Sequence, residues 1–136
     1  MKRYVSLLLS LTLLLSCTPI SHAASEEAVQ AAQSLYELGL FNGTGTNPDG
    51  TPTFDLDRAP TRQEAIIMLV RLLGKEEEAK AGTWETPFTD VDNWAKPYVG
   101  YAYTNGLTTG TGDNTFGSAD TVTASQYLTF VLRALE

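Results

Sequence analysis

Residues 61–71 read Thr61-Arg-Gln-Glu-Ala-Ile-Ile-Met-Leu-Val-Arg71, and residues 123–133 read Thr123-Ala-Ser-Gln-Tyr-Leu-Thr-Phe-Val-Leu-Arg133. Each stretch opens with Thr, has Glu or Gln three residues later and continues as an apolar helical pattern. This combination is typical of a helix that begins with a capping box, in which the two polar side chains bind free backbone amides. The same helix start therefore occurs twice, once at Thr61 and once at Thr123.

The repetition extends upstream of both helix starts. Leu38-Gly39-Leu40 corresponds to Asn105-Gly106-Leu107, so Gly39 matches Gly106 as Thr61 matches Thr123. The first copy is longer between these two points because of an insertion around residues 47–51. Two copies of one small unit predict a modular binding or anchoring protein, because such a unit cannot bury an apolar face alone.

The pattern predicts four helices and a mainly α fold: two tandem helix–loop–helix modules with Gly-rich loops and little or no β structure. We expect the helices at residues 26–38, 61–73, 92–105 and 124–135, with one short extended piece around Phe54. The expected buried faces are Ile66, Leu69, Val70 and Leu73 in the second helix, Trp94, Tyr98, Tyr101 and Ala102 in the third, and Tyr127, Leu128, Val131, Leu132 and Leu135 in the fourth.

Residues 1–24 are expected to be a signal peptide. Lys2 and Arg3 precede an apolar stretch at residues 5–15, and Ser21-His22-Ala23 offers a cleavage site. Cys17 leaves an alternative open, since Leu-Leu-Ser-Cys17 is similar to the motif of lipid-anchored bacterial proteins, and membrane attachment would depend on that lipidation. The remaining chain divides into module 1 (25–74), a linker (75–86) and module 2 (87–136).

Composition excludes several classes of function for the exported chain. Without Lys2 and Arg3 it has seven basic and sixteen acidic residues, a net charge of −9, which argues against nucleic acid as a partner. Cys17 and His22, the single cysteine and the single histidine, both fall in the signal peptide. We therefore expect no cofactor, no metal site of Cys or His ligands, and no catalytic residues of an enzyme.

Arg62 is the residue that local structure does not explain. Capping accounts for Thr61 and Glu64, but a cation in the first turn of a helix opposes the helix dipole. A guanidinium beside free backbone amides would suit a ligand that carries a carboxylate. The alternative reading of Arg62, as a solvated surface arginine, stays open on these grounds alone.

Several motifs together resemble the S-layer homology domain. They are Phe88-x-Asp90-Val91-x-x-Trp94-Ala95, the turn Asn105-Gly106-Leu107-x-x-Gly110, Phe116 and the two helix starts, and they cover most of residues 26–136 as two modules. Thr61-Arg62-Gln63-Glu64 is similar to the family signature Thr-Arg-Ala-Glu. The resemblance implies an exported protein at the bacterial cell surface that binds secondary cell-wall polysaccharide, often pyruvylated, in grooves between modules.

The resemblance also implies the site residues, Arg62 with Glu64 and, as weaker candidates, Asp90 and Trp94. Three features depart from the family pattern. Ala124 stands where the second signature would have its arginine, and module 1 lacks the Phe-x-Asp-Val-x-x-Trp motif, since Glu27 aligns with Trp94. There are also two modules where wall-binding proteins of the family usually have three. Self-association as a homo-oligomer would compensate through avidity. The alternative is a structural or protein-interaction module that has lost glycan binding.

Overall fold

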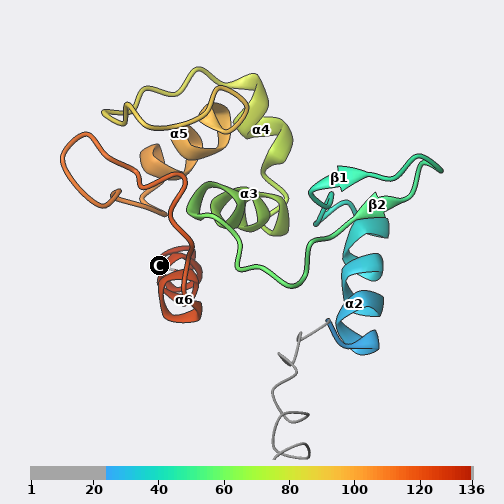
Figure 1. Cartoon of the computed structure of the whole chain (residues 1–136). Helices are drawn as coiled ribbons and strands as arrows, with labels where there is room; N and C mark the ends of the chain where they lie inside the picture. Colours follow the sequence, from blue (N-terminus) through green and yellow to red (C-terminus); the bar gives the residue numbers. More distant parts are fainter. Residues whose placement is uncertain (1–23, 136) are drawn as a thin grey trace, which may run out of the picture.

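The computed structural model describes residues 24–135, so the signal peptide expected at residues 1–24, with Cys17, lies outside the described residues except for Ala24 (Figure 1). The elements are α2 (Glu26–Glu37), β1 (Gly45–Thr46), β2 (Pro52–Thr53), α3 (Arg62–Leu72), α4 (Glu76–Ala81), α5 (Lys96–Thr104) and α6 (Ala124–Arg133). The predicted mainly α fold is confirmed. The extended piece expected around Phe54 is β2, which pairs antiparallel with β1.

Both predicted capping boxes are present. The Thr61 hydroxyl accepts from the Glu64 amide at 3.4 Å, and the Glu64 carboxylate accepts from the Thr61 amide at 2.7 Å. In α6 the corresponding distances between Thr123 and Gln126 are 3.3 and 2.8 Å. Four backbone amides at the two helix starts are therefore satisfied locally, as the sequence indicates.

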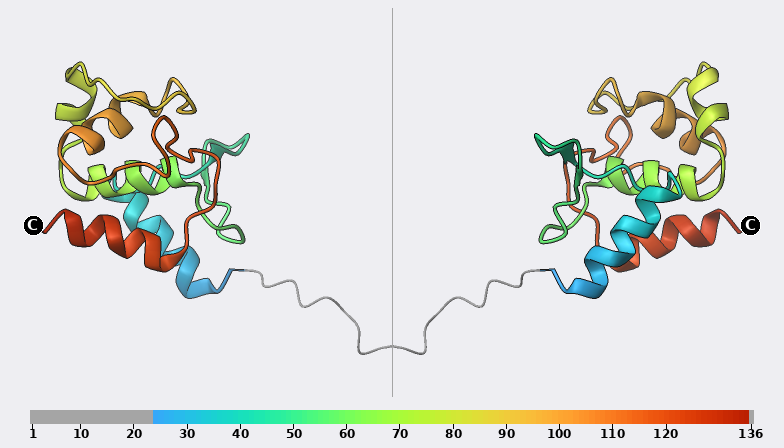
Figure 2. Two further views of the ribbon diagram at one scale, coloured as in Figure 1. Left: turned by 90° about the vertical axis from the view of Figure 1, so that its left-hand side faces the viewer. Right: turned by 90° about the vertical axis from the view of Figure 1, so that its right-hand side faces the viewer.

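Helix α3 lies at the centre of the packed core. Helices α4 and α5 pack on one side of it and α6 on the other, an arrangement that can be followed in Figures 1 and 2. Helix α5 does not pack on α6, although α6 is the next helix along the chain, and no helix of the described residues packs on α2. The core consists of apolar residues of α3, α5 and the loops around them, together with Ala79 of α4 and Phe130 of α6.

Several predicted details are wrong. Helix α5 begins at Lys96, after a turn in which the Asp92 carbonyl accepts from the amides of Ala95 and Lys96, so Trp94 precedes the helix and is 55% exposed. Leu73 is also exposed, and α6 buries Phe130 instead of its leucines. The division into two modules and a linker stays a prediction, and the linker segment, residues 75–86, contains the short helix α4.

The backbone repeats between the first half of the chain (residues 24–74) and the second half (residues 87–135). Gly39 and Gly106 have φ of 72° and 75°, a left-handed conformation that glycine adopts without steric cost. Asp55 and Gly117, which correspond when Thr61 is aligned with Thr123, are also left-handed, with φ of 47° and 78°. The same turns therefore recur at the same places of the repeat.

No helix among residues 24–135 is long and apolar enough to cross a membrane. Within the same residues, no three His, Cys, Asp or Glu side chains are grouped so that they could hold a metal ion.

Candidate functional site

Arg62 lies at the start of α3 between two aromatic rings. Its guanidinium carbon is 5.3 Å from the centre of the Phe116 ring and 4.8 Å from that of Phe130. Phe116 comes from the loop before α6 and Phe130 from α6, so three separate segments enclose this side chain. The residue is only 9% exposed, and the cation–π contacts hold the charge in place.

Arg62 forms no ion pair among residues 24–135. None of the ion pairs found there involves it, and its buried Nε has no hydrogen-bond partner. Burial lowers the pKa of Arg62, the positive charge of Arg133 lowers it further, and Asp120 opposes both. A desolvated cation without a counter-ion is unfavourable, so an anion at this place would be bound favourably.

Asp90 holds the loop that carries Phe116. Its carboxylate accepts from the backbone amides of Phe116, Gly117 and Ser118 at 2.7, 2.8 and 3.2 Å. Desolvation would raise the pKa of Asp90, but these amide donors outweigh it and keep the pKa below its ordinary value. Asp90 therefore acts on Arg62 indirectly, by fixing the aromatic ring beneath it.

The free amides expected beside Arg62 are not free. The Arg62 amide donates to the Asp120 carbonyl at 2.8 Å, and the Gln63 amide donates to the Ser118 carbonyl at 3.4 Å. Sequence reasoning could not detect this, because the acceptors lie in the other half of the chain. The loop of the second half thus caps the helix of the first half, and the side chain of Arg62 is what a ligand would meet.

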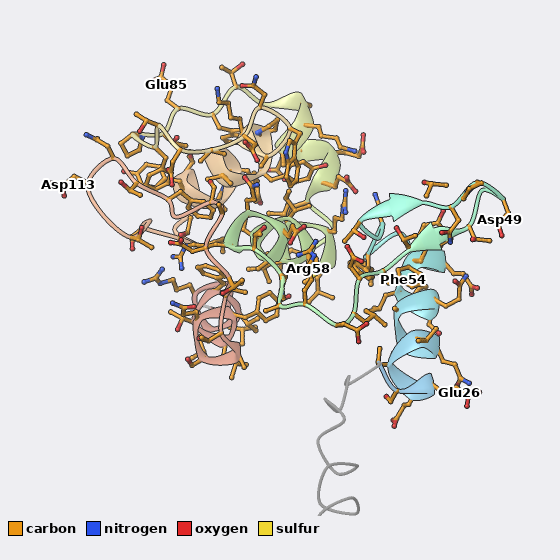
Figure 3. The ribbon with its side chains drawn as sticks, in the orientation of Figure 1. Glu26, Asp49, Phe54, Arg58, Glu85 and Asp113 are labelled. Carbon is orange, nitrogen blue, oxygen red and sulfur yellow. The ribbon has the colours of Figure 1, made fainter. Side chains whose placement is uncertain are left out.

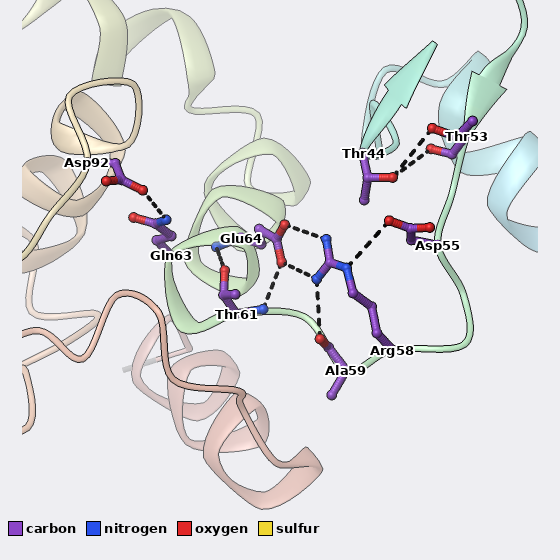
Figure 4. Close-up of polar contacts among 9 residues, drawn as sticks. All are labelled: Thr44, Thr53, Asp55, Arg58, Ala59, Thr61, Gln63, Glu64 and Asp92. Atoms are coloured by element: carbon purple, nitrogen blue, oxygen red, sulfur yellow. Dashed lines mark hydrogen bonds and ion pairs between the residues drawn. The ribbon is translucent and has the colours of Figure 1, made fainter. Parts of the chain in front are cut away.

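Glu64 is engaged by an arginine that the sequence analysis did not single out. Arg58 donates to both carboxylate oxygens of Glu64, at 2.8 and 2.7 Å, in addition to the capping bond from Thr61 (Figure 4). The hydrogen bonds from Arg58 are the main cause of a pKa of about 2 for Glu64. No local pattern marks Arg58, since it lies in an irregular loop.

Gln63 is a second residue that sequence reasoning missed. Its Nε2 donates to Asp92 at 2.7 Å, which links α3 to the turn before α5 (Figure 4). Its Oε1 is buried without a partner, as is the hydroxyl of Ser118. Three unpartnered buried polar atoms therefore gather where α3 begins, those of Gln63, Ser118 and Arg62.

Trp94 lies apart from Arg62, on a different surface. An open cavity of about 790 Å³, which we call the α2–α3 groove, separates α2 from α3. Trp94 and Glu64 both line it, whereas Arg62 and Asp90 do not. The structure thus brings Arg62 and Asp90 together around one loop, and Glu64 and Trp94 along the groove.

The family model of the S-layer homology domain matches residues 87–126. The chain is 36% identical over 108 residues to a cell surface protein of Thermoanaerobacter kivui, covering 77% of this chain and 14% of that protein. It is 30% identical to the middle cell wall protein of Brevibacillus brevis and to an endoglucanase of a Bacillus species, covering 99% of this chain and 14% and 15% of those proteins. The chain thus spans about a seventh of the relatives it matches. No solved structure matches it.

Proposed function

Because residues 87–126 are an S-layer homology domain, we propose that this chain is a non-catalytic module that attaches to the bacterial cell wall by binding a wall polysaccharide. The printed names of the relatives support this, since several are cell surface or cell wall proteins. One relative is an endoglucanase, but the chain covers 15% of it, and nothing in that match assigns catalysis to the shared part.

The proposal includes two units, residues 25–74 and 87–136, joined by residues 75–86. The family model matches within the second unit. The recurrence of capping boxes and of left-handed turns in residues 24–74 supports a first unit of the same kind. The first unit supplies Arg62 and the second supplies the loop and helix around it, so a ligand at Arg62 would bind between the two.

The single observation that carries the ligand assignment is the buried, unpaired charge of Arg62. A carboxylate on the glycan, such as a pyruvate ketal, would provide the direct ion pair that Arg62 does not form with any described residue. Asp90 and Glu64 are occupied by the hydrogen bonds given above, so we assign them positioning roles. Trp94 offers an exposed aromatic face to a neighbouring sugar, on the groove side.

A protein-interaction module without glycan binding is the second candidate. The observation in its favour is the apolar surface of α6, where Leu128 and Leu132 are more than half exposed. Ala124 also leaves the second helix start without an arginine. In that case the two units would serve as a scaffold.

The test is co-sedimentation of residues 25–136 with Gram-positive wall sacculi, before and after chemical removal of the secondary polysaccharide. We expect retention that is lost on removal and falls about tenfold or more in Arg62→Gln, since a charge-assisted pair contributes roughly 1.5–3 kcal/mol. Arg133→Gln, at a nearby cation, is the matched control, and thermal melting verifies that both variants fold. Equal retention of Arg62→Gln and the parent would refute the assignment of Arg62.

A further inference from the structure

Two apolar helix faces, one on α6 and one on α2, are not covered by another helix within the described residues. Comparison of the two halves of the repeat indicates that these faces could pack on each other. The first face is the stripe of Leu128, Leu132 and Leu135 on α6 and its C-terminal end, exposed at 58, 62 and 78%. In α3 the positions equivalent to the first two are Ile66 and Val70, and both are completely buried. Helix α3 is covered by α4, α5 and α6, whereas α6 packs on α3 alone.

The second face is the side of α2 that lines the α2–α3 groove. It consists of Ala28, Ala31, Ala32 and Leu35. When Gly39 is aligned with Gly106, these positions correspond to Ala95, Tyr98, Val99 and Ala102 of α5 and its N-cap, all of which are buried. In contrast, α2 buries only Ala32, and no described helix packs on it.

The packing of α5 on α3 shows how such faces combine. In this pair, the first helix of one half covers the second helix of the preceding half. Helix α2 corresponds to α5 in the repeat, but its apolar face covers no described helix. Helix α6 corresponds to α3, but no helix covers it in the way that α5 covers α3. The two faces are therefore complementary, and they belong to opposite ends of the repeat.

The loops support the same match. The loop of residues 116–120 caps the amides of α3 through its backbone carbonyls, and the equivalent loop, residues 54–58, has the same left-handed turn. Within the described residues, no loop caps the amides of Ala124 and Ser125 in this way. Phe54, at the position of Phe116, lies beside α2 next to the groove (Figure 3).

Charge favours the pairing of α2 with α6 over the pairing of either helix with itself. Helix α2 carries Glu26, Glu27 and Glu37 and no basic residue. Helix α6 carries Arg133 and no acidic residue. Two copies of α2 would repel one another, whereas α2 and α6 attract.

We propose that the α2–α3 groove binds α6 of a second copy of this chain. The leucine stripe of one copy packs against the small side chains of α2 in the other, and the loop of residues 54–58 covers the start of the bound α6. When the α6 of each copy lies in the α2–α3 groove of the other copy, the two copies form a closed dimer. In Figure 1, α6 lies below and to the left of α3, and α2 lies to the right of α3. This association does not depend on glycan binding at Arg62, and it fills the groove that Trp94 and Glu64 line.

The test is light scattering coupled to size exclusion with residues 25–136, over a ~100-fold range of concentration. We expect the parent chain to double its mass as concentration rises. The variants Leu128→Gln/Leu132→Gln on α6 and Ala31→Gln/Leu35→Gln on α2 should each weaken dimerisation by about 100-fold. Thr129→Gln and Val29→Gln, about 100° around the same helices, are the matched controls and should leave it unchanged.

Mixing the two variants separates this pairing from its alternatives. The α6 of the α2 variant can still enter the groove of the α6 variant, so the heterodimer keeps one of the two contacts intact. The mixture should therefore contain more heterodimer than either variant forms homodimer, although less than the dimer of the parent chain. An α2 variant that dimerises as well as the parent chain would show that α6 pairs with itself, and the proposal would be wrong. A parent chain that stays monomeric at every concentration would overturn it as well.

Discussion

Phe54 and Phe116 occupy the same position of the repeat but different environments. Phe116 is completely buried, with its ring centre 5.6 Å from that of Phe88 and its face beneath Arg62. Phe54 is half-buried and packs only within its own half, 5.5 Å from Phe41 and 6.1 Å from Tyr36. Both follow a similar turn, so local sequence does not account for the difference.

The neighbouring element accounts for it. The loop of the second half rests on the start of α3 and is held there by Asp90, whereas the loop of the first half has no helix start of the described residues to cap. Each unit thus forms its own turns and aromatic cluster, but full burial depends on the unit beside it. This dependence is the expected behaviour of repeat proteins, in which interfaces between units supply much of the stability.

Truncating the two phenylalanines gives the largest expected effect. Phe116→Ala should lower the free energy of unfolding by about 3–4 kcal/mol, because it empties a closed site, while Phe54→Ala should cost roughly 1–2 kcal/mol, because its site is half open. Urea denaturation of both variants measures the difference. Equal losses would mean that the two halves are equally packed in solution.

Removing the carboxylate of Asp90 tests how the loop is held. Asp90→Ala leaves three backbone amides without their acceptor and should cost roughly 2–3 kcal/mol. Asp49→Ala is the matched control in the first half, since Asp49 accepts only from Thr51 in its own turn. We expect that control to melt close to the parent chain; a loss as large as that of Asp90→Ala would contradict the special role of the second loop.

The sequence could predict the features that depend on neighbouring residues, but not those that depend on contacts between the two halves of the chain. The capping boxes and the Gly39 and Gly106 turns depend on chemistry within a few residues, and these predictions are confirmed. The apolar pattern of α6 predicted that Leu128 and Leu132 are buried, and this prediction is wrong, because periodicity identifies an apolar face but not what covers it. The apolar periodicity also predicted that the third helix includes Trp94. This is wrong, because periodicity does not reveal the turn that ends at Ala95.

The candidate site was predictable only in part. Arg62 stood out because it opposes the local dipole, but its two aromatic neighbours, Phe116 and Phe130, come from the other half of the chain. Contacts between such distant positions leave no local pattern in a single sequence. The same is true of the occupied amides at the start of α3 and of the Arg58–Glu64 ion pair, which joins an irregular loop to a helix.

The two capping boxes should respond differently to acid. The pKa of Glu64 is about 2 when folded and ordinarily 4.5, so its contribution to stability is complete above about pH 4.5 and is lost as the pH falls towards 2. Gln126 does not titrate. Glu64→Gln should therefore lower stability at pH 7 by about 1–2 kcal/mol, after allowance for partial solvent screening, and not near pH 2.

Denaturation curves from pH 7 to acid measure this difference. Gln126→Glu is the counterpart, and there Asp120 stands at the position equivalent to Arg58. The new carboxylate gains no ion pair, so we expect no added stability at pH 7. A stabilised Gln126→Glu variant would show that capping by a charge matters more than the arginine beside it.

Restoring the missing arginine at position 124 should cause the smallest change in stability, and it tests whether the two helix starts differ only in this residue. Ala124→Arg completes the signature of the second helix start, but position 124 lacks the counterpart of Phe116, because no loop of the described residues covers it. The new side chain should remain solvated, change stability by no more than about 0.5 kcal/mol and leave retention on wall sacculi unaltered. Retention that rose at concentrations where the chain is monomeric would mean that the signature suffices by itself. A rise confined to concentrations where the chain dimerises would place Phe54 of the second copy beside the new arginine, and would make the site a property of two adjacent units.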